Sequence, residues 1–441
     1  MQSLCNAGMR EIARQIQVFF RGAVGKNIAA LGVLQVANYL IPLIVIPIVV
    51  RVLGAELFGR VSYAQNIVTY LTLIVNYGFE YSATRQIALN KENKPKTERI
   101  FWSVIVAKLG LLMLSFVLLG MLYFVVPRIE QDWRLYVYTA LVNVGVVFFP
   151  TWYLQGIQDM SKMAWANFLI KLLGALLVIG LVRQATAYRL YPLLLSLSSI
   201  VVGIGALVYV VQHYDIQWRP SSVSTLWDAK TLREVLRAGL PIFINNVFVS
   251  CYTTANLTIL GAYADDSVLG YFSGAQRIIL ALNACVVLPV STAVFPEMSH
   301  RFAVSATEGW KYFKRVLLLA GGFALLCSFL TFLFAPLIVT IMLGDGFADS
   351  VGLLRWMSPL PFLTMVATIL TVQGMYGLGL QRFAPWVGMT LAVICISMNL
   401  WLLPRIGVKG VVWSWTLTEV AECLIVGLIL HKKGRRLCST L

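Results

Sequence analysis

Three basic residues stand inside long apolar runs of the sequence, where a positive charge is costly in hydrocarbon. They are Lys108, Lys171 and Arg277, and each lies roughly eight residues, or about 12 Å of helix, from the nearer end of its run. A cation at this depth either extends its side chain to the membrane surface or binds an anion inside the protein. The three side chains are therefore candidate contacts for an anionic substrate.

Arg277 is the best placed of the three because its run, "LGYFSGAQRIILAL", also carries a polar stripe. Lys171 shares a helical face with Asn167 and Gly174, whereas no stripe accompanies Lys108. For Lys108, extension of the side chain to the membrane surface is therefore as good an explanation as substrate binding. The stripe around Arg277 consists of Ser273, Gln276, Arg277 and Asn283.

Polar residues at helical spacing also mark three other apolar runs. They are Gln35, Asn38, Tyr39 and Pro42 in the first run, Asn66, Thr69, Tyr70, Asn76, Tyr77 and Glu80 in the second, and Asn245, Asn246, Ser250, Thr253 and Thr254 in the seventh. Such faces avoid lipid, so they either bond neighbouring helices or line a cavity. The cavity is favoured because the stripes recur in both halves of the chain. We add Asn38, Asn66, Asn76, Asn246, Gln276 and Asn283 to the candidate substrate contacts.

Buried acidic residues are fewer, and they suggest ion coupling or charge pairing. Glu80 belongs to the second stripe, while Glu419 and Glu422 lie three residues apart in the last apolar run. Each could neutralise a buried cation or bind H⁺ or Na⁺ as a coupling ion. The three histidines and seven cysteines are dispersed without a CxxC pair, so we expect no metal site, no disulfide framework and no cofactor.

The composition identifies the protein class. The 441 residues are 59% hydrophobic and 12% charged, whereas soluble domains carry roughly 25% charged residues. We predict an all-α integral membrane protein of about twelve helices, because runs of about 20 apolar residues span a bilayer as helices. The net charge of +16 is typical of basic cytoplasmic loops, so nucleic acid is not an expected partner. The runs lie near 28–50, 61–83, 100–124, 135–156, 163–182, 190–211, 238–262, 269–294, 315–343, 352–377, 384–403 and 408–430.

Charge and loop length predict the organisation of these spans. Lobes at 28–211 and 238–430 are joined by a cytoplasmic linker at 212–237, and a basic cytoplasmic tail covers 431–441. The side that holds both termini carries 23 Lys and Arg residues against nine on the other, which places the termini in the cytoplasm. No cleavable signal peptide is expected. Residues 1–27 are either an interfacial amphipathic helix or an extension upstream of the true start.

The chain repeats itself. "VLGA" at 52–55 is matched by "ILGA" at 259–262, and "FGRVSYAQNIVTYL" by "LGYFSGAQRIILAL". In this alignment Gly59 corresponds to Gly270, Gln65 to Gln276, and Asn66 to Arg277, so the two copies differ at the candidate cation. Parallel six-helix repeats are typical of transporters that handle the substrate between the halves.

Several stretches resemble one known family across nearly the whole chain from about residue 27. They are "NYLIPLIVIPIVVRVLGAELFG", "NYGFEYSATRQIA", "FPTWYLQGIQDM", "LPIFINNVFVSCYTTANLTILGAY", "PVSTAVFPEMS" and "MLGDGFADSVGLLRWMSPLPFL". The sequence resembles the Wzx-type O-antigen flippases, which are polysaccharide transporters of the multidrug/oligosaccharidyl-lipid/polysaccharide exporter superfamily.

The resemblance implies two pseudo-symmetric six-helix lobes in a V shape around a cationic central lumen, and alternating access. The implied substrate is an undecaprenyl-diphosphate-linked O-antigen repeat unit that moves from the cytoplasmic to the periplasmic leaflet of the bacterial inner membrane. Arg277, Lys171 and Lys108 would then contact the diphosphate. Membrane lipids are expected partners, and the O-antigen polymerase and the chain-length regulator are candidate protein partners.

Two other functions fit the sequence less well. A cation-coupled multidrug exporter of the same superfamily would need a lumen rich in acids, whereas this chain offers three buried cations against Glu80. A membrane polysaccharide polymerase would need a large periplasmic loop with catalytic residues, and the loops here are short. A transporter, and not an enzyme, is the expected class.

Overall fold

The computed structural model describes residues 23–159, 161–217 and 229–434, and every regular element in these ranges is a helix. The predicted amphipathic segment up to residue 22, part of the predicted linker at 218–228 and the tail from 435 lie outside the described residues. In the first half the elements are α2 (Ala23–Asn76), α3 (Phe79–Leu89), α4 (Lys94–Val125), α5 (Pro127–Gln131), α6 (Trp133–Ala140), α7 (Val142–Phe148), α8 (Thr151–Ile157), α9 (Ser161–Leu181), η1 (Ala185–Ala187) and α10 (Leu190–His213). In the second half they are α12 (Ala229–Thr253), α13 (Ala255–Tyr263), α14 (Asp266–Val304), α15 (Ala306–Leu333), α16 (Ala335–Met342), η2 (Asp345–Phe347), α17 (Ala348–Met357), α18 (Leu360–Thr368), η3 (Ile369–Tyr376), η4 (Gln381–Phe383), α19 (Ala384–Ile406), α20 (Val408–Ile429) and η5 (Leu430–Gly434).

Most of the predicted spans correspond to helices that could cross a membrane. By length and composition, eight helices within the described ranges qualify, or nine if the bent pair Asp345–Met357 and Leu360–Tyr376 forms one span. The other three predicted spans, 28–50, 61–83 and 163–182, fall on α2, α3 and α9. Together they account for the predicted all-α membrane architecture.

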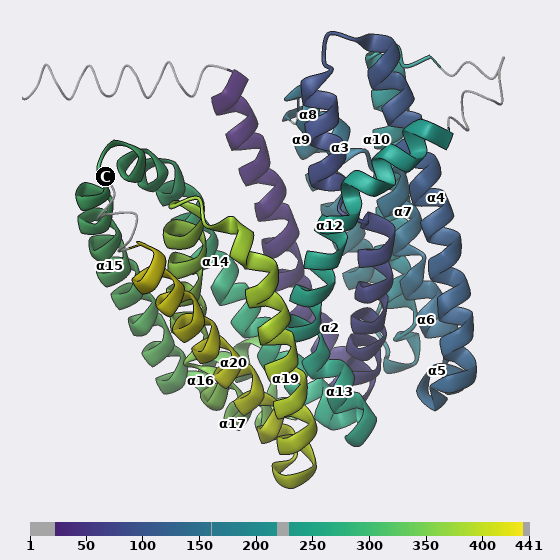
Figure 1. Ribbon diagram of the computed structural model, residues 1–441. Helices are drawn as coiled ribbons and strands as arrows, with labels where there is room; N and C mark the ends of the chain where they lie inside the picture. The colour runs from purple at the N-terminus through teal and green to yellow at the C-terminus, as the bar shows by residue number, and fades with distance from the viewer. Residues whose placement is uncertain (1–22, 160, 218–228, 435–441) are drawn as a thin grey trace, which may run out of the picture. The chain divides into compact units, whose positions relative to one another are not determined.

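The chain divides into two compact units, and each is described by itself. Among the described residues, unit 1 contains 23–45, 68–159, 161–182, 189–217 and 229–244. In this unit α4, α7 and α10 run alongside one another (Figure 1). Its core is built around the buried Phe101, whose ring centroid lies 5.4 Å from that of Trp152 and 5.2 Å from that of Tyr153. This aromatic cluster joins α4 to α8.

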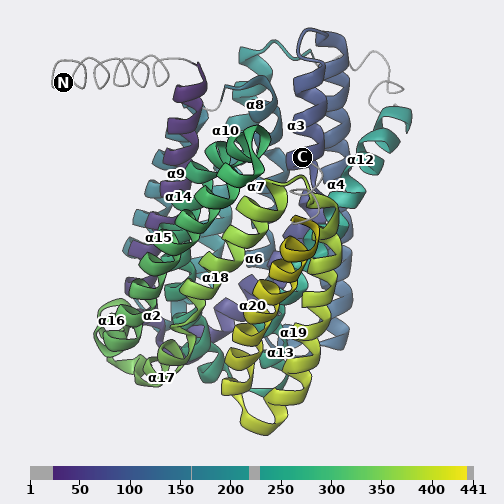
Figure 2. The ribbon, with the colours of Figure 1, turned by 60° about the vertical axis from the view of Figure 1, so that its left-hand side comes forward.

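Among the described residues, unit 2 contains 46–67, 183–188 and 245–434. Its helices α14, α15, α18 and α20 pack side by side (Figure 2), around buried residues that include Met298, Phe313 and Met365. The predicted lobe boundaries at 28–211 and 238–430 stay predictions.

The middle of α2 belongs to unit 2 because four kinds of contact hold it there. Arg51 donates to the Ile341 carbonyl at 2.6 Å, close to the C-terminus of α16. Arg60 pairs with Asp266 at 2.6 Å, at the N-terminus of α14. The Phe58 ring meets an aromatic ring of η2 edge-on, and the α2 backbone touches that of α14 at a glycine pair.

The two copies of the repeat have different backbone conformations at the shared "LGA" segment. In the first copy, Gly54 adopts a φ of 70°, and α2 continues through a kink at this point. A residue with a side chain would be strained in this conformation. In the second copy, α13 ends at Tyr263 and α14 begins at Asp266, with two residues in the connection. The same sequence motif thus produces a kink once and a helix–loop–helix once.

The second predicted span is broken near its end. Tyr77 and Gly78 have φ values of 46° and 80°, so α2 stops at Asn76 and a new helix, α3, begins at Phe79. The Tyr77 ring stacks on Phe243 with a centroid distance of 4.9 Å, which holds this turn in place. Glu80, which was predicted near the end of a continuous membrane span, therefore lies in the first turn of α3.

Candidate functional site

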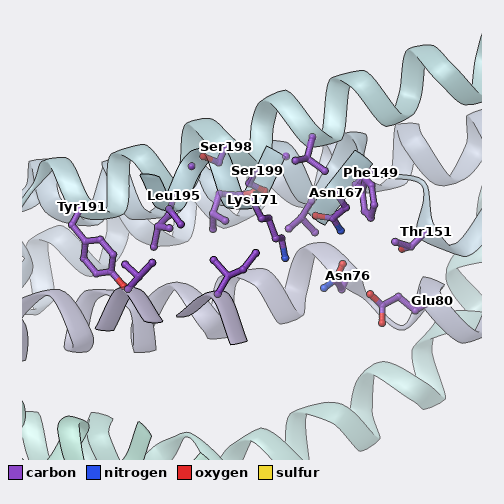
Figure 3. A pocket seen from close by; sticks show the side chains of 18 of the residues that line it. Asn76, Glu80, Phe149, Thr151, Asn167, Lys171, Tyr191, Leu195, Ser198 and Ser199 are labelled. Carbon is purple, nitrogen blue, oxygen red and sulfur yellow. Dashed lines mark hydrogen bonds between the residues drawn. The ribbon is translucent and has the colours of Figure 1, made fainter. Parts of the chain in front are cut away.

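A cavity of about 520 Å³ lies within unit 1, among α2, α3, α4, α7, α8, α9 and α10. Its size is within the range of roughly 300–1,000 Å³ that is usual for ligand sites. Four of the predicted site residues line it, and these are Asn76, Glu80, Lys108 and Lys171. Figure 3 shows how several of the lining side chains converge on one space.

Lys171 is the cation that enters this space most directly. In Figure 3 its side chain extends from α9 towards the helix that carries Asn76. One turn earlier on α9, Asn167 also lines the cavity and is only 5% exposed. Its Oδ1 atom is buried and has no hydrogen-bond partner in the described part of the chain. The cavity thus combines a cation with an unused polar atom, as a polar ligand requires.

Lys108 is buried in unit 1, with 2% of its surface exposed. Its Nζ atom donates a hydrogen bond to the Val146 carbonyl at 3.0 Å, which ties α4 to α7. The side chain therefore does not extend to the surface, which was the alternative explanation of this residue. Glu80 attracts the Lys108 ammonium group electrostatically.

The cavity lining contains more basic than acidic side chains. Lys108 and Lys171 carry positive charge, and Glu80 carries the single negative charge among the lining residues. Because Glu80 is exposed whereas Lys108 is buried, solvent screens the carboxylate more strongly than the ammonium group.

Arg277 lies in unit 2, against the other copy of its own repeat. Its Nη2 atom donates to Gln65 Oε1 at 2.5 Å and to Ser62 Oγ at 3.4 Å, and its guanidinium carbon lies 4.9 Å from the centroid of the Phe58 ring. These contacts use part of the guanidinium, which remains half-buried. Arg277 does not line the unit 1 cavity.

The equivalent residue of the first copy makes a different contact. Asn66 donates from Nδ2 to Thr258 Oγ1 at 2.6 Å, which ties α2 to α13 inside unit 2. The duplicated position therefore joins helices in both copies, by an amide in one and by a guanidinium in the other.

The structure distributes the remaining predicted residues over several places. Asn246, Gln276 and Asn283 are half-buried in unit 2, and the Oδ1 atom of Asn283 is buried without a partner among the residues described. Glu419 and Glu422 are half-buried on α20, where Glu422 accepts a hydrogen bond from Thr371 Oγ1 at 3.0 Å. The side chain of Asn38 lies outside the described residues.

Sequence reasoning missed several polar residues of the cavity. Tyr191, Ser198 and Ser199 of α10 line it, together with Thr151 of α8. The stretch "SLSS" within an otherwise apolar helix was an available signal, because small polar residues often mark the packed face of a membrane helix.

Comparison with known proteins identifies the family. The family model described as "Polysaccharide biosynthesis protein" matches residues 24–302. The chain belongs to the polysaccharide biosynthesis protein family. A protein of Escherichia coli (strain K12), named "Putative O-antigen transporter", is 29% identical over 79% of this chain and 83% of its own length. A protein of the same name from Shigella dysenteriae is 27% identical over 91% of this chain and 98% of its own length.

The fold has a counterpart among solved structures. The lipid II flippase MurJ in its inward closed conformation matches with a TM-score of 0.70 and 11% identity, over 92% of this chain and 89% of that structure. At this identity the match establishes the fold alone. Family and fold together confirm the resemblance and the all-α membrane architecture expected from the sequence.

Proposed function

We propose that this protein moves a lipid-linked O-antigen repeat unit across the bacterial inner membrane, from the cytoplasmic to the periplasmic leaflet. Its family and the names of its relatives support a transporter of this kind rather than an enzyme. The observation that carries the proposal is the unit 1 cavity, which is of suitable size and which Lys108 and Lys171 both line.

The proposed substrate explains why lysines stand at this depth. A diphosphate cannot cross hydrocarbon by itself, because the transfer of an unpaired charge from water into an apolar medium is prohibitively costly. A cavity that supplies ammonium groups replaces part of the hydration that the phosphate oxygens lose. The polyprenyl tail can stay in the lipid while the diphosphate and the first sugars occupy the cavity.

The membrane potential favours the proposed direction. With the cytoplasm negative, outward movement of an anion gains about 2.3 kcal/mol per charge per 100 mV. Both termini on the cytoplasmic side, a multi-pass inner-membrane location and alternating access complete the proposal. Glu80, Glu419 and Glu422 are the proposed positions for a coupling H⁺ or Na⁺. The O-antigen polymerase and the chain-length regulator are the proposed protein partners.

Deletion and complementation test the function. We expect a strain without this protein to lose surface O-antigen and to accumulate the lipid-linked unit, and we expect the wild-type gene to restore both. Electrophoresis of lipopolysaccharide and mass spectrometry of extracted lipids measure these two quantities. Normal O-antigen in the deletion strain, together with drug resistance on overexpression, would instead support a multidrug exporter.

Arg277 is proposed as a second contact for the diphosphate. One variant distinguishes this role from the hydrogen bonds that Arg277 makes to α2. Arg277→Gln keeps a side chain that can bond Gln65 and Ser62 but removes the charge. We expect surface O-antigen to fall at least tenfold at an unchanged protein level, measured by lipopolysaccharide electrophoresis and immunoblotting. Gln65→Leu is the control, because it removes the 2.5 Å bond and leaves the charge in place. Normal O-antigen with Arg277→Gln and loss with Gln65→Leu would assign Arg277 to helix packing.

A further inference from the structure

A second, smaller pocket opens on the surface of unit 2, among α15, α17 and α20. It has a volume of about 260 Å³ and is lined by Phe332, Arg355, Trp356, Ser358, Pro359, Trp413 and Thr416. The candidate substrate contacts lie elsewhere, so the proposed transport function leaves this pocket unexplained.

Arg355 is the charged residue of this pocket. Its guanidinium carbon lies 5.8 Å from the centroid of the Phe332 ring. Within the described residues, no carboxylate lies within ion-pair distance of it. The Arg355 side chain is exposed, so its donors are available to a ligand. An arginine in a membrane segment normally has an anionic partner, and the residues that the structure describes supply none.

Two tryptophans also line the pocket. The rings of Trp356 and Trp413 lie 5.5 Å apart, tilted by 54°, and 46% of Trp356 and 39% of Trp413 are exposed. On α15, Phe329 and Phe332 are 60% and 52% exposed. This surface suits acyl chains beside a charged group better than a soluble anion, which would gain nothing from the aromatic rings.

The pocket lies near the first residues of two helices. Arg355 stands seven residues after the start of α17, and Trp413 stands five residues after the start of α20. At 1.5 Å per residue these distances are about 10 Å and 8 Å from the helix ends. Tryptophans near the ends of membrane helices are typical of the interfacial belt, where a guanidinium can reach the phosphates of lipids.

We propose that the Arg355 pocket binds the phosphate group of a membrane lipid. The guanidinium would donate two parallel hydrogen bonds to phosphate oxygens, while the rings of Phe332, Trp356 and Trp413 contact the glycerol or the first acyl carbons. With the orientation given under the proposed function, the lipid belongs to the periplasmic leaflet. The phosphate can come from an anionic phospholipid of the bulk membrane or from a polyprenyl phosphate.

Lipid binding to the purified full-length protein in detergent tests this proposal. Native mass spectrometry would count the adducts formed with phosphatidylglycerol, with undecaprenyl phosphate and with phosphatidylcholine as the zwitterionic reference. We expect Arg355→Ala to weaken binding of one or both anionic lipids about tenfold, and Arg355→Lys to weaken it less. The lipid that responds identifies the source of the phosphate.

Arg405→Ala is the matched control. Arg405 also stands near a helix end beside a tryptophan, with its Nη1 atom bonded to the Trp401 carbonyl at 2.6 Å and its guanidinium carbon 4.9 Å from the centroid of the Trp401 ring. We expect this variant to bind each lipid within twofold of the wild type. Equal binding by wild type, Arg355→Ala and Arg405→Ala would overturn the proposal and leave Arg355 as an ordinary interfacial arginine. Because the assay needs no O-antigen, its outcome is independent of the complementation experiment.

Discussion

Replacing Lys171 by methionine is expected to abolish surface O-antigen while the protein remains in the membrane at its normal level. Methionine keeps most of the length and the apolar stem of the side chain, so the packing of α9 should survive. The positive charge, however, is removed from the cavity that also contains Glu80 and Lys108. Without Lys171, only the ammonium group of Lys108 remains in the cavity to bind the diphosphate. The carboxylate of Glu80 opposes this binding.

The magnitude follows from the energetics of buried charge pairs. Truncating one partner of such a pair costs about 2–5 kcal/mol, and each 1.4 kcal/mol corresponds to a tenfold change in rate or affinity. We therefore expect at least a thirtyfold fall in O-antigen display and a matching rise in the lipid-linked unit. Lipopolysaccharide electrophoresis and lipid mass spectrometry measure both effects.

Two variants serve as controls for Lys171→Met. Lys171→Arg keeps the charge and should retain a substantial part of the activity. Lys311→Met removes an exposed lysine that pairs with Glu308 at 3.1 Å on α15, and it should be neutral. Wild-type O-antigen in the Lys171→Met strain would contradict the role of the unit 1 cavity in transport.

Replacing Gly59 by alanine is expected to destabilise the protein, because the added methyl group has no room between α2 and α14. A Cβ atom at Gly59 would lie 1.9 Å from the Asp266 carbonyl oxygen and 2.7 Å from the Gly270 nitrogen. Both neighbours are backbone atoms, so neither can rotate away, and α2 must separate from α14. Overpacking of this kind costs typically 1–3 kcal/mol and occasionally more.

The thermal midpoint of the purified protein and its level in the membrane measure this effect. We expect both to fall with Gly59→Ala. The control is Gly110→Ala on α4, where a Cβ atom would meet nothing within 4 Å. Alanine is a better helix former than glycine by about 1 kcal/mol, so this control should be neutral or slightly stabilising. Equal midpoints for the two variants would show that α2 and α14 can move apart at little cost.

Much of the architecture could be predicted because hydrophobicity is a local property of the chain. An apolar run of about 20 residues forms a membrane helix whatever its neighbours are, and the helices follow the predicted runs. The break after Asn76 is an exception, because it depends on the positive φ values of Tyr77 and Gly78. A glycine signals that such a turn is permitted, but not that it occurs.

The candidate site could be predicted only in part. The cost of charge in hydrocarbon identified Lys108, Lys171 and Arg277 from residue type and depth alone. The sequence also favoured Arg277, because its polar stripe was the most obvious. The structure brings the two lysines into one cavity instead, and it places Arg277 against Gln65 and Ser62.

By itself, the sequence determined that this is an all-α membrane protein with an internal repeat and buried cations. The tertiary structure decided which of these residues meet. Lys108 and Lys171 come together because α4 and α9 both border the space beside α7 and α10, and Gly59 meets Gly270 because α2 and α14 cross at that point. Such contacts depend on how whole helices rotate and cross, and packing between residues distant in sequence determines both. The pattern along one helix does not contain that information.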